Sequence, residues 1–164
     1  MATKVSLNQV VESLELASDE MSWFVSKRTG QVVMLSHEAM RLAEDDSKAN
    51  LPAWQEEELR MARAVLESTD WLGLPTKFEV HEWEIMNRFA QSLSVPAQRE
   101  EILDAIHGSG AFRQFKSAIR RLRLEDTWFS FRGSAFEDMA RSWLNDHGFE
   151  IDDDVQRGGR PTRR

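Results

Sequence analysis

Apolar residues recur at helical spacing along most of the chain. Residues 6–17 place Leu7, Val10 and Leu14 near one stripe behind Ser6, a residue suited to cap a helix, and so predict a helix. Similar stripes, bounded by capping residues, Pro or Gly, predict further helices over residues 37–43, 52–66, 81–93, 96–108, 111–122 and 127–145. The second half of the chain is therefore expected to be nearly all helical.

Two short runs rich in β-branched and aromatic residues predict strands instead. Residues 21–26 and 31–35 flank Gly30, which can adopt positive φ, and this pattern indicates a β-hairpin. Because an isolated hairpin is only marginally stable, it should lie against helices or gain a third strand. Residues 77–80 are the candidate for that strand, whereas residues 71–75 are interpreted as a buried connector. The predicted fold class is α+β and predominantly helical, with the N-terminal helix and hairpin packed on a C-terminal bundle of about four helices.

The length of 164 residues suits one domain. We predict a single globular domain over residues 1–150, with a hairpin-containing part (1–80) and a helical part (81–150). A disordered tail is expected over residues 151–164, because this end of the chain lacks periodicity and is nearly free of large apolar groups. Charge is divided unevenly: the first 82 residues carry 8 Lys and Arg against 15 Asp and Glu, and the second half carries 13 of each.

Composition excludes several classes of function. The chain has no Cys, so disulfides, thiolate metal sites and cysteine nucleophiles are excluded. Its net charge of −7 opposes attraction of the whole molecule to nucleic acid or to an anionic membrane. No apolar run approaches the roughly 20 residues that cross a bilayer, and the N-terminus lacks the apolar core of a signal peptide. We therefore expect a cytoplasmic protein that does not enter membranes.

No catalytic or metal-binding constellation can be drawn from the sequence. His81 begins a stretch that starts like a zinc-protease motif, but the second His is missing. Neither a Ser-His-Asp order nor a nucleophile elbow is visible among the remaining residues. The sequence thus assigns no catalytic residue, no metal ligand and no cofactor, and it favours a protein that is not an enzyme.

Three segments of the sequence are distinctive when they are taken together. Leu-Pro-Thr-Lys-Phe-Glu begins at Leu74, with Glu-Ile-Met following at Glu84. Gly-Ser-Gly-Ala-Phe-Arg-Gln-Phe-Lys begins at Gly108, and Trp-Phe-Ser-Phe-Arg begins at Trp128, with Trp143, Leu144 and Gly148 later. Together these segments resemble an uncharacterised bacterial protein family. The resemblance covers about residues 5–150 and implies a bacterial, cytoplasmic, single-domain protein. It implies no activity, and no catalytic role is carried over.

A basic stripe is the most prominent charge pattern. Arg113, Lys116, Arg120 and Arg123 group together on a helical wheel, beside the apolar stripe that begins at Phe112. Like charges three and four residues apart repel by about 0.2–0.5 kcal/mol per pair unless something opposes them. The plainer explanation is that the chain's own carboxylates oppose these charges, or that water simply solvates them. A protein partner or the phosphates of a nucleic acid could also oppose the repulsion between these cations.

The turn before this stripe and the residues after it are further candidates. Residues 108–110 hold two Gly around Ser109, so free backbone amides there could bind an anion with help from Arg113 and Lys116. In the alternative interpretation Gly108 ends one helix, Gly110 bends the chain and Ser109 caps the next helix.

Arg132 falls on the apolar face of the last predicted helix, near Trp128. A guanidinium there must stack on aromatic rings, pair with a carboxylate such as Asp104 or Asp126, or meet an anionic ligand. The remaining alternative is that Gly133 breaks the helix, in which case Arg132 does not lie on that face.

We therefore expect a non-enzymatic interaction or regulatory protein with an unidentified protein partner. Its contact surface would centre on residues 111–123 and 128–132. The alternative is binding of RNA or a phosphorylated small molecule at the 108–110 turn and the basic stripe. The candidate contact residues are Ser109, Gly110, Arg113, Lys116, Arg120, Arg123, Trp128 and Arg132.

Overall fold

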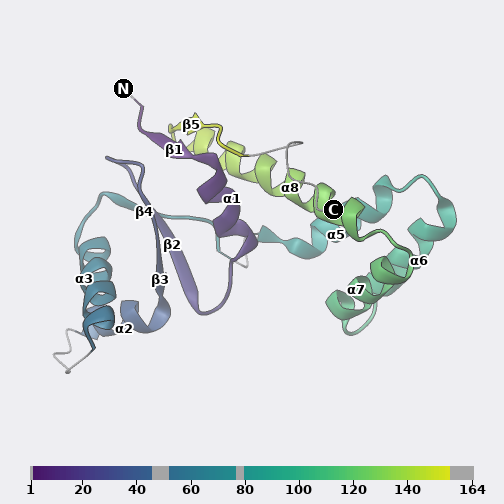
Figure 1. Cartoon of the computed structure of the whole chain (residues 1–164), viewed down its shortest axis with the longest axis horizontal. Helices are drawn as coiled ribbons and strands as arrows, with labels where there is room; N and C mark the ends of the chain where they lie inside the picture. The colour runs from purple at the N-terminus through teal and green to yellow at the C-terminus, as the bar shows by residue number, and fades with distance from the viewer. Residues whose placement is uncertain (1, 46–51, 77–79, 156–164) are drawn as a thin grey trace. The chain divides into compact units, whose positions relative to one another are not determined.

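The protein has two compact units. The computed structural model describes residues 2–45, 52–76 and 80–155 (Figure 1). Unit 1 comprises Met1–Glu79 and Ala140–Arg164, and unit 2 comprises Val80–Met139. The last residues of the helical part expected from the sequence thus belong to unit 1. Helices and small sheets occur together, which confirms the α+β class.

The helices begin and end close to the residues that the apolar stripes predict. Unit 1 contains β1 (Lys4–Ser6), α1 (Leu7–Glu15), β2 (Met21–Ser26), β3 (Val32–Ser36), α2 (His37–Asp45), α3 (Ala53–Glu67), β4 (Trp71–Gly73) and β5 (Glu150–Asp152). Unit 2 contains α5 (Glu82–Ser92), α6 (Pro96–Ile106), α7 (Ala111–Arg121) and the first part of α8 (Glu125–Asp146), which continues into unit 1. Among the described helices, none is long and apolar enough to span a bilayer.

The predicted hairpin is present and gains a third strand. β2 pairs with β3 in antiparallel fashion, and the turn Gly30 has φ +79°. A Cβ on Gly30 would collide with the carbonyl oxygen of Lys4, so this position needs Gly for space as well as for conformation. The third strand is β4, which pairs with β2 and gives the order β3-β2-β4. The interpretation of residues 71–75 as a connector was therefore wrong for β4, and residues 77–79 of the candidate strand lie outside the described residues.

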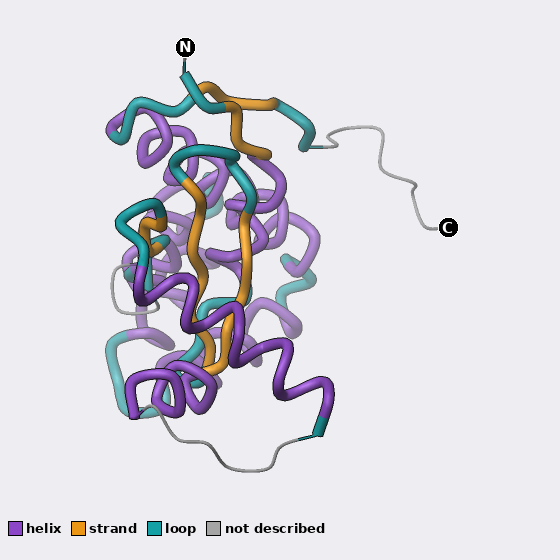
Figure 2. The backbone as a smooth tube through the Cα atoms, turned by 90° about the vertical axis from the view of Figure 1, so that its left-hand side faces the viewer, coloured by secondary structure: helices purple, strands orange, loops and turns teal. Residues whose placement is uncertain are grey.

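Helices α2 and α3 supply the apolar side chains that cover one face of this sheet. Leu35 of β3 packs with Ala39, Ala62 and Val65 in a buried cluster. Figure 2 views unit 1 from the side of α3, which crosses in front of the orange strands. Ser36 caps α2 as predicted, because its Oγ accepts a hydrogen bond from the Ala39 N–H at 3.1 Å.

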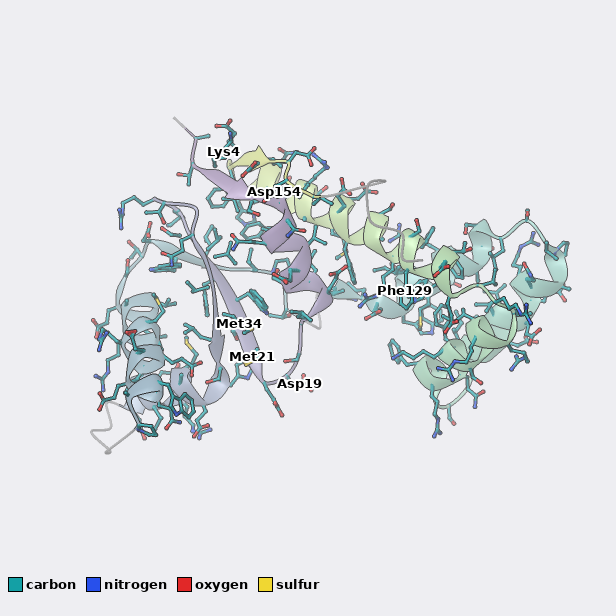
Figure 3. All side chains as sticks on the ribbon, in the orientation of Figure 1. Lys4, Asp19, Met21, Met34, Phe129 and Asp154 are labelled. Carbon is teal, nitrogen blue, oxygen red and sulfur yellow. The ribbon has the colours of Figure 1, made fainter. Side chains whose placement is uncertain are left out.

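The two ends of the described chain pair with each other. β1 and β5 run parallel, with Val5 opposite Ile151. The Asp154 carboxylate accepts hydrogen bonds from the Ser6 hydroxyl (2.6 Å) and the Asn8 N–H (2.8 Å), at the start of α1. Figure 3 labels Lys4 and Asp154 at this end of unit 1. Residues 151–155 thus have a defined structure where a disordered tail was predicted, and the rest of that tail, 156–164, lies outside the described residues.

Unit 2 is built around aromatic rings. Phe89 of α5 makes edge-on contacts with Phe115, Trp128 and Phe131, at centroid distances of 6.1, 5.2 and 5.4 Å. Phe115 and Trp128 also meet edge-on, 4.6 Å apart. Such pairs add stability beyond the area they bury. This core fixes which side of α7 faces inward.

Candidate functional site

Helix α7 is strongly two-sided. Phe115, Ala118 and Ile119 are buried on its inner side. Arg113, Lys116 and Arg120 are exposed and recur three and four residues apart, on the opposite side. We call these three side chains the basic face of α7. The grouping that the sequence predicted for them is confirmed.

The chain's own carboxylates oppose only part of this charge. Arg121 donates to Glu101 of α6, with Nε 2.9 Å from Oε2. Arg120 lies 3.8 Å from Glu125, but both side chains are largely exposed, so this pair contributes little. Among the described residues, Arg113, Lys116 and Arg123 have no carboxylate oxygen within 4.0 Å. Internal carboxylates therefore oppose Arg121 and, only weakly, Arg120.

Arg123 occupies the position that ends α7 rather than a further helical turn. Its φ is +60°, and the two bonds around it, Leu124 N–H to Ile119 C=O and Arg123 N–H to Arg120 C=O, form the helix-ending motif in which Gly is usual. A side chain in this conformation costs about 1 kcal/mol or more. Arg123 is exposed, but it does not extend the basic face by helical spacing as the sequence predicted.

The N-terminus of α7 has no side-chain cap. Gly110 is the N-cap with φ +69°, and no side chain accepts a bond from the first amides of the helix. The alternative in which Ser109 caps α7 is therefore wrong. The Arg113 guanidinium reaches back toward this turn, because its Nη2 lies 3.8 Å from the place of a Cβ on Gly110. The turn and the basic face are thus neighbours.

Of the other predicted contact residues, Trp128 is buried and Arg132 is half-buried. Trp128 is only 5 % exposed and lies in the aromatic core. Arg132 pairs with Glu82, Nε to Oε2 at 2.7 Å, and its guanidinium lies 4.6 Å from the centre of the Phe136 ring. The carboxylate partner is thus Glu82 rather than Asp104 or Asp126. Gly133 does not break α8, which continues through it.

The exposed aromatic residues of unit 2 are different ones. Phe112 is 52 % exposed and Phe129 is 62 % exposed. Phe112 lies one turn before Lys116 on α7, so it borders the basic face. The sequence signal for this exposure is that Phe112 lies in the first turn of the helix, at the edge of its apolar stripe. Figure 3 labels Phe129 on α8.

Unit 1 holds a polar pair that the sequence did not reveal. Ser22 Oγ of β2 and His37 Nε2 of α2 lie 2.8 Å apart. The two residues belong to a strand and a helix that only the hairpin brings together, and no local pattern links them. Within the described ranges, no group of three His, Asp or Glu side chains is arranged to hold a metal ion.

No family model, curated protein or solved structure matches this chain. The resemblance to an uncharacterised bacterial family stays a prediction. The function is therefore argued from the sites themselves.

Proposed function

We propose that unit 2 is a protein-binding module that takes an acidic segment of another protein on α7. The observation that carries the proposal is the set of exposed cations without a carboxylate partner among the described residues: Arg113, Lys116 and Arg123. No acidic residue occurs in the sequence between Asp104 and Glu125. Carboxylates of a partner would relieve the repulsion between these cations. The protein would act as an interaction or regulatory protein of the bacterial cytoplasm, without a catalytic step.

The surroundings of the basic face favour a protein over a nucleic acid. Residues 80–139 carry 8 Lys and Arg against 9 Asp and Glu, so the positive charge is confined to one patch. A long polyanion would soon meet acidic side chains, whereas a short acidic segment matches the patch in size. Exposed Phe112 adds an apolar contact beside Lys116. Arg and aromatic residues are enriched at protein interfaces.

The test is binding of a fluorescein-labelled acidic peptide of about ten Glu residues, followed by anisotropy across a salt series. The triple variant Arg113→Glu, Lys116→Glu, Arg123→Glu should bind at least about tenfold more weakly, because attraction becomes repulsion. The matched control reverses three exposed cations of unit 1, Lys27, Arg28 and Arg41, which changes the net charge equally. The control variant should keep its affinity within about twofold.

Other outcomes would overturn the proposal. Equal losses in both triple variants would show an effect of net charge rather than of these three positions. Absence of peptide binding even at low salt would contradict the proposal. A labelled poly-U RNA that binds more tightly than the peptide, and loses affinity only in the α7 variant, would assign the face to nucleic acid.

A further inference from the structure

The three-stranded sheet of unit 1 has an edge at β3. The order β3-β2-β4 gives β3 a neighbouring strand on one side only, whereas β2 is paired on both sides. Met34, which Figure 3 labels, lies in the middle of β3 and is 46 % exposed. Backbone groups left unpaired along a sheet edge are a template for a further strand.

The pairing of β2 with β3 shows which backbone groups point away from the sheet. The Ser26 N–H donates to the Gln31 C=O, and bonded pairs alternate along an antiparallel ladder, so even-numbered residues of β2 bond to β3. Their partners in the register are odd-numbered residues of β3, such as Val33. The N–H and C=O groups of Val32 and Met34 therefore point outward. Within the described ranges, these four groups have no other hydrogen-bond partner.

The edge is closed at both ends of this pair of residues. The Ser36 N–H also points outward, but it donates to the Glu58 carboxylate of α3 at 2.8 Å. At the other end the chain enters the turn, where the Gly30 N–H donates back to the Ser26 C=O. Only Val32 and Met34 are thus open to a further strand.

The open groups of β3 are complementary to a second copy of themselves. When two β3 strands lie antiparallel with the two Val33 residues opposite each other, Val32 of each copy lies opposite Met34 of the other. All eight open groups then pair, in four hydrogen bonds. A register with Val32 opposite Ser36 would instead need the N–H that Glu58 already holds.

Charges at the two ends of the edge favour the same antiparallel arrangement. The turn end carries exposed Lys27 and Arg28, and the α2 end carries exposed Glu20 and Glu38. Among the described residues, none of these four side chains has an ion-pair partner. Antiparallel strands bring the cationic end of each copy to the acidic end of the other, whereas parallel strands would bring like charges together.

We propose that unit 1 pairs with a second copy of this chain through β3, so that the two sheets join across a two-fold axis. The same surface serves both copies, as a closed dimer requires. Met34 then packs against Val32 of the second copy on one face of the joined sheet, which covers its exposed side chain. The contact is short, so the dimer is expected to be weak and to form at high concentration.

Single cysteines test the register, because the full chain contains no Cys of its own. Residues opposite each other at a non-bonded position have Cα atoms about 4.5 Å apart, which is within the range that a disulfide spans. Val33→Cys should therefore form a disulfide-linked dimer under mild oxidation. Gln31→Cys is the control, since in this register each Gln31 lies opposite Leu35 of the other copy and it should give little linked dimer.

Sedimentation velocity over a concentration series tests the edge itself. Met34→Pro removes an N–H that points outward and leaves the bonds between β2 and β3 in place, and Pro is tolerated at such edge positions. It should weaken the dimer at least about tenfold, because two of the four bonds between the copies are lost. Met34→Leu keeps both the N–H and an apolar side chain, and should dimerise like the original chain.

Circular dichroism shows whether Met34→Pro is folded. If it is not, Met34→Lys replaces it, because a charge at the edge opposes pairing without changing the backbone. The proposal is overturned if the original chain stays monomeric up to about 1 mM, the concentration at which even a very weak dimer forms. It is equally overturned if the folded edge variant dimerises as tightly as the original chain, or if Gln31→Cys is linked as readily as Val33→Cys.

Discussion

The two units offer candidate sites of opposite kinds. Unit 1 holds a mainly apolar pocket of about 260 Å³ beside β2, in which Ser22 and His37 are hydrogen-bonded to each other. Unit 2 displays its polar groups on the outside of α7, where water solvates each cation. In the pocket the two polar side chains already satisfy each other, so they indicate no ligand by themselves. On the surface only the grouping of like charges carries information, because a single exposed charge costs almost nothing.

The largest expected effect separates the interiors of the two units. Phe89→Ala removes the ring at the centre of the unit 2 core and should lower the free energy of unfolding of that unit by about 3–5 kcal/mol. Hydrogen exchange would show protection lost in α5, α6 and α7 but kept in β2 and β3. Equal loss of protection from exchange in both units would contradict the comparison, because the two units would then unfold together.

The next effect concerns the paired ends of unit 1. Ending the chain after Phe149 removes β5 and the Asp154 bonds to Ser6 and Asn8, and should destabilise unit 1 by at least about 2 kcal/mol. Ending it after Val155 keeps all of these contacts and is the control. Urea denaturation measures both. If the two truncated chains were equally stable, residues 150–155 would behave as the tail that the sequence predicted.

Two ion pairs of unit 2 distinguish interior from surface charge. Glu82 and Glu125 both lie in the first turn of a helix and both face an Arg. Glu82→Gln weakens a half-buried pair and should cost about 1–2 kcal/mol, whereas Glu125→Gln should cost less than about 0.5 kcal/mol. Thermal denaturation of the two variants gives the comparison. Equal costs would show that Arg132 is as freely solvated as Arg120.

The smallest effect concerns the ends of α7 and α8. Both helices close with the same pair of backbone bonds, but α8 has Gly148 at the left-handed position where α7 has Arg123. Arg123→Gly should therefore raise stability by about 0.5 kcal/mol, while Gly148→Ala lowers it by about 1 kcal/mol. Arg123→Gly should at the same time weaken binding of the acidic peptide. Unchanged affinity would remove Arg123 from the contact surface.

Local patterns allowed much of unit 2 to be predicted. The ends of α5, α6 and α7 follow from Pro, Gly and apolar spacing within about ten residues. The exposed side of α7 follows from a helical wheel of its own residues. The burial of Trp128 and the carboxylate partner of Arg132 could not be predicted in the same way, because a helical wheel shows which side of a helix is apolar but not which carboxylate, here Glu82, lies opposite. That partner is 50 residues away in the sequence.

Unit 1 depends on pairings between distant segments, and these were missed. β1, β4 and β5 have three residues each, too few to show an alternating pattern. Asp152 lies in a run of acidic residues typical of a tail, yet the strand forms because β1 lies beside it. The pocket was hidden for the same reason, since its wall comes from segments between residues 17 and 76.

The central claim is that Arg113, Lys116 and Arg123, which have no carboxylate partner among the described residues, serve a binding partner and not the fold. The most direct test is the free energy of unfolding of the variant Arg113→Gln, Lys116→Gln, Arg123→Asn, measured by urea denaturation. Gln keeps most of the helix propensity, and Asn tolerates the left-handed conformation. Because repulsion between the cations is relieved, we expect stability to be unchanged or to rise by a few tenths of a kcal/mol. A loss of more than about 1 kcal/mol would show that these side chains hold unit 2 together, and would contradict the account.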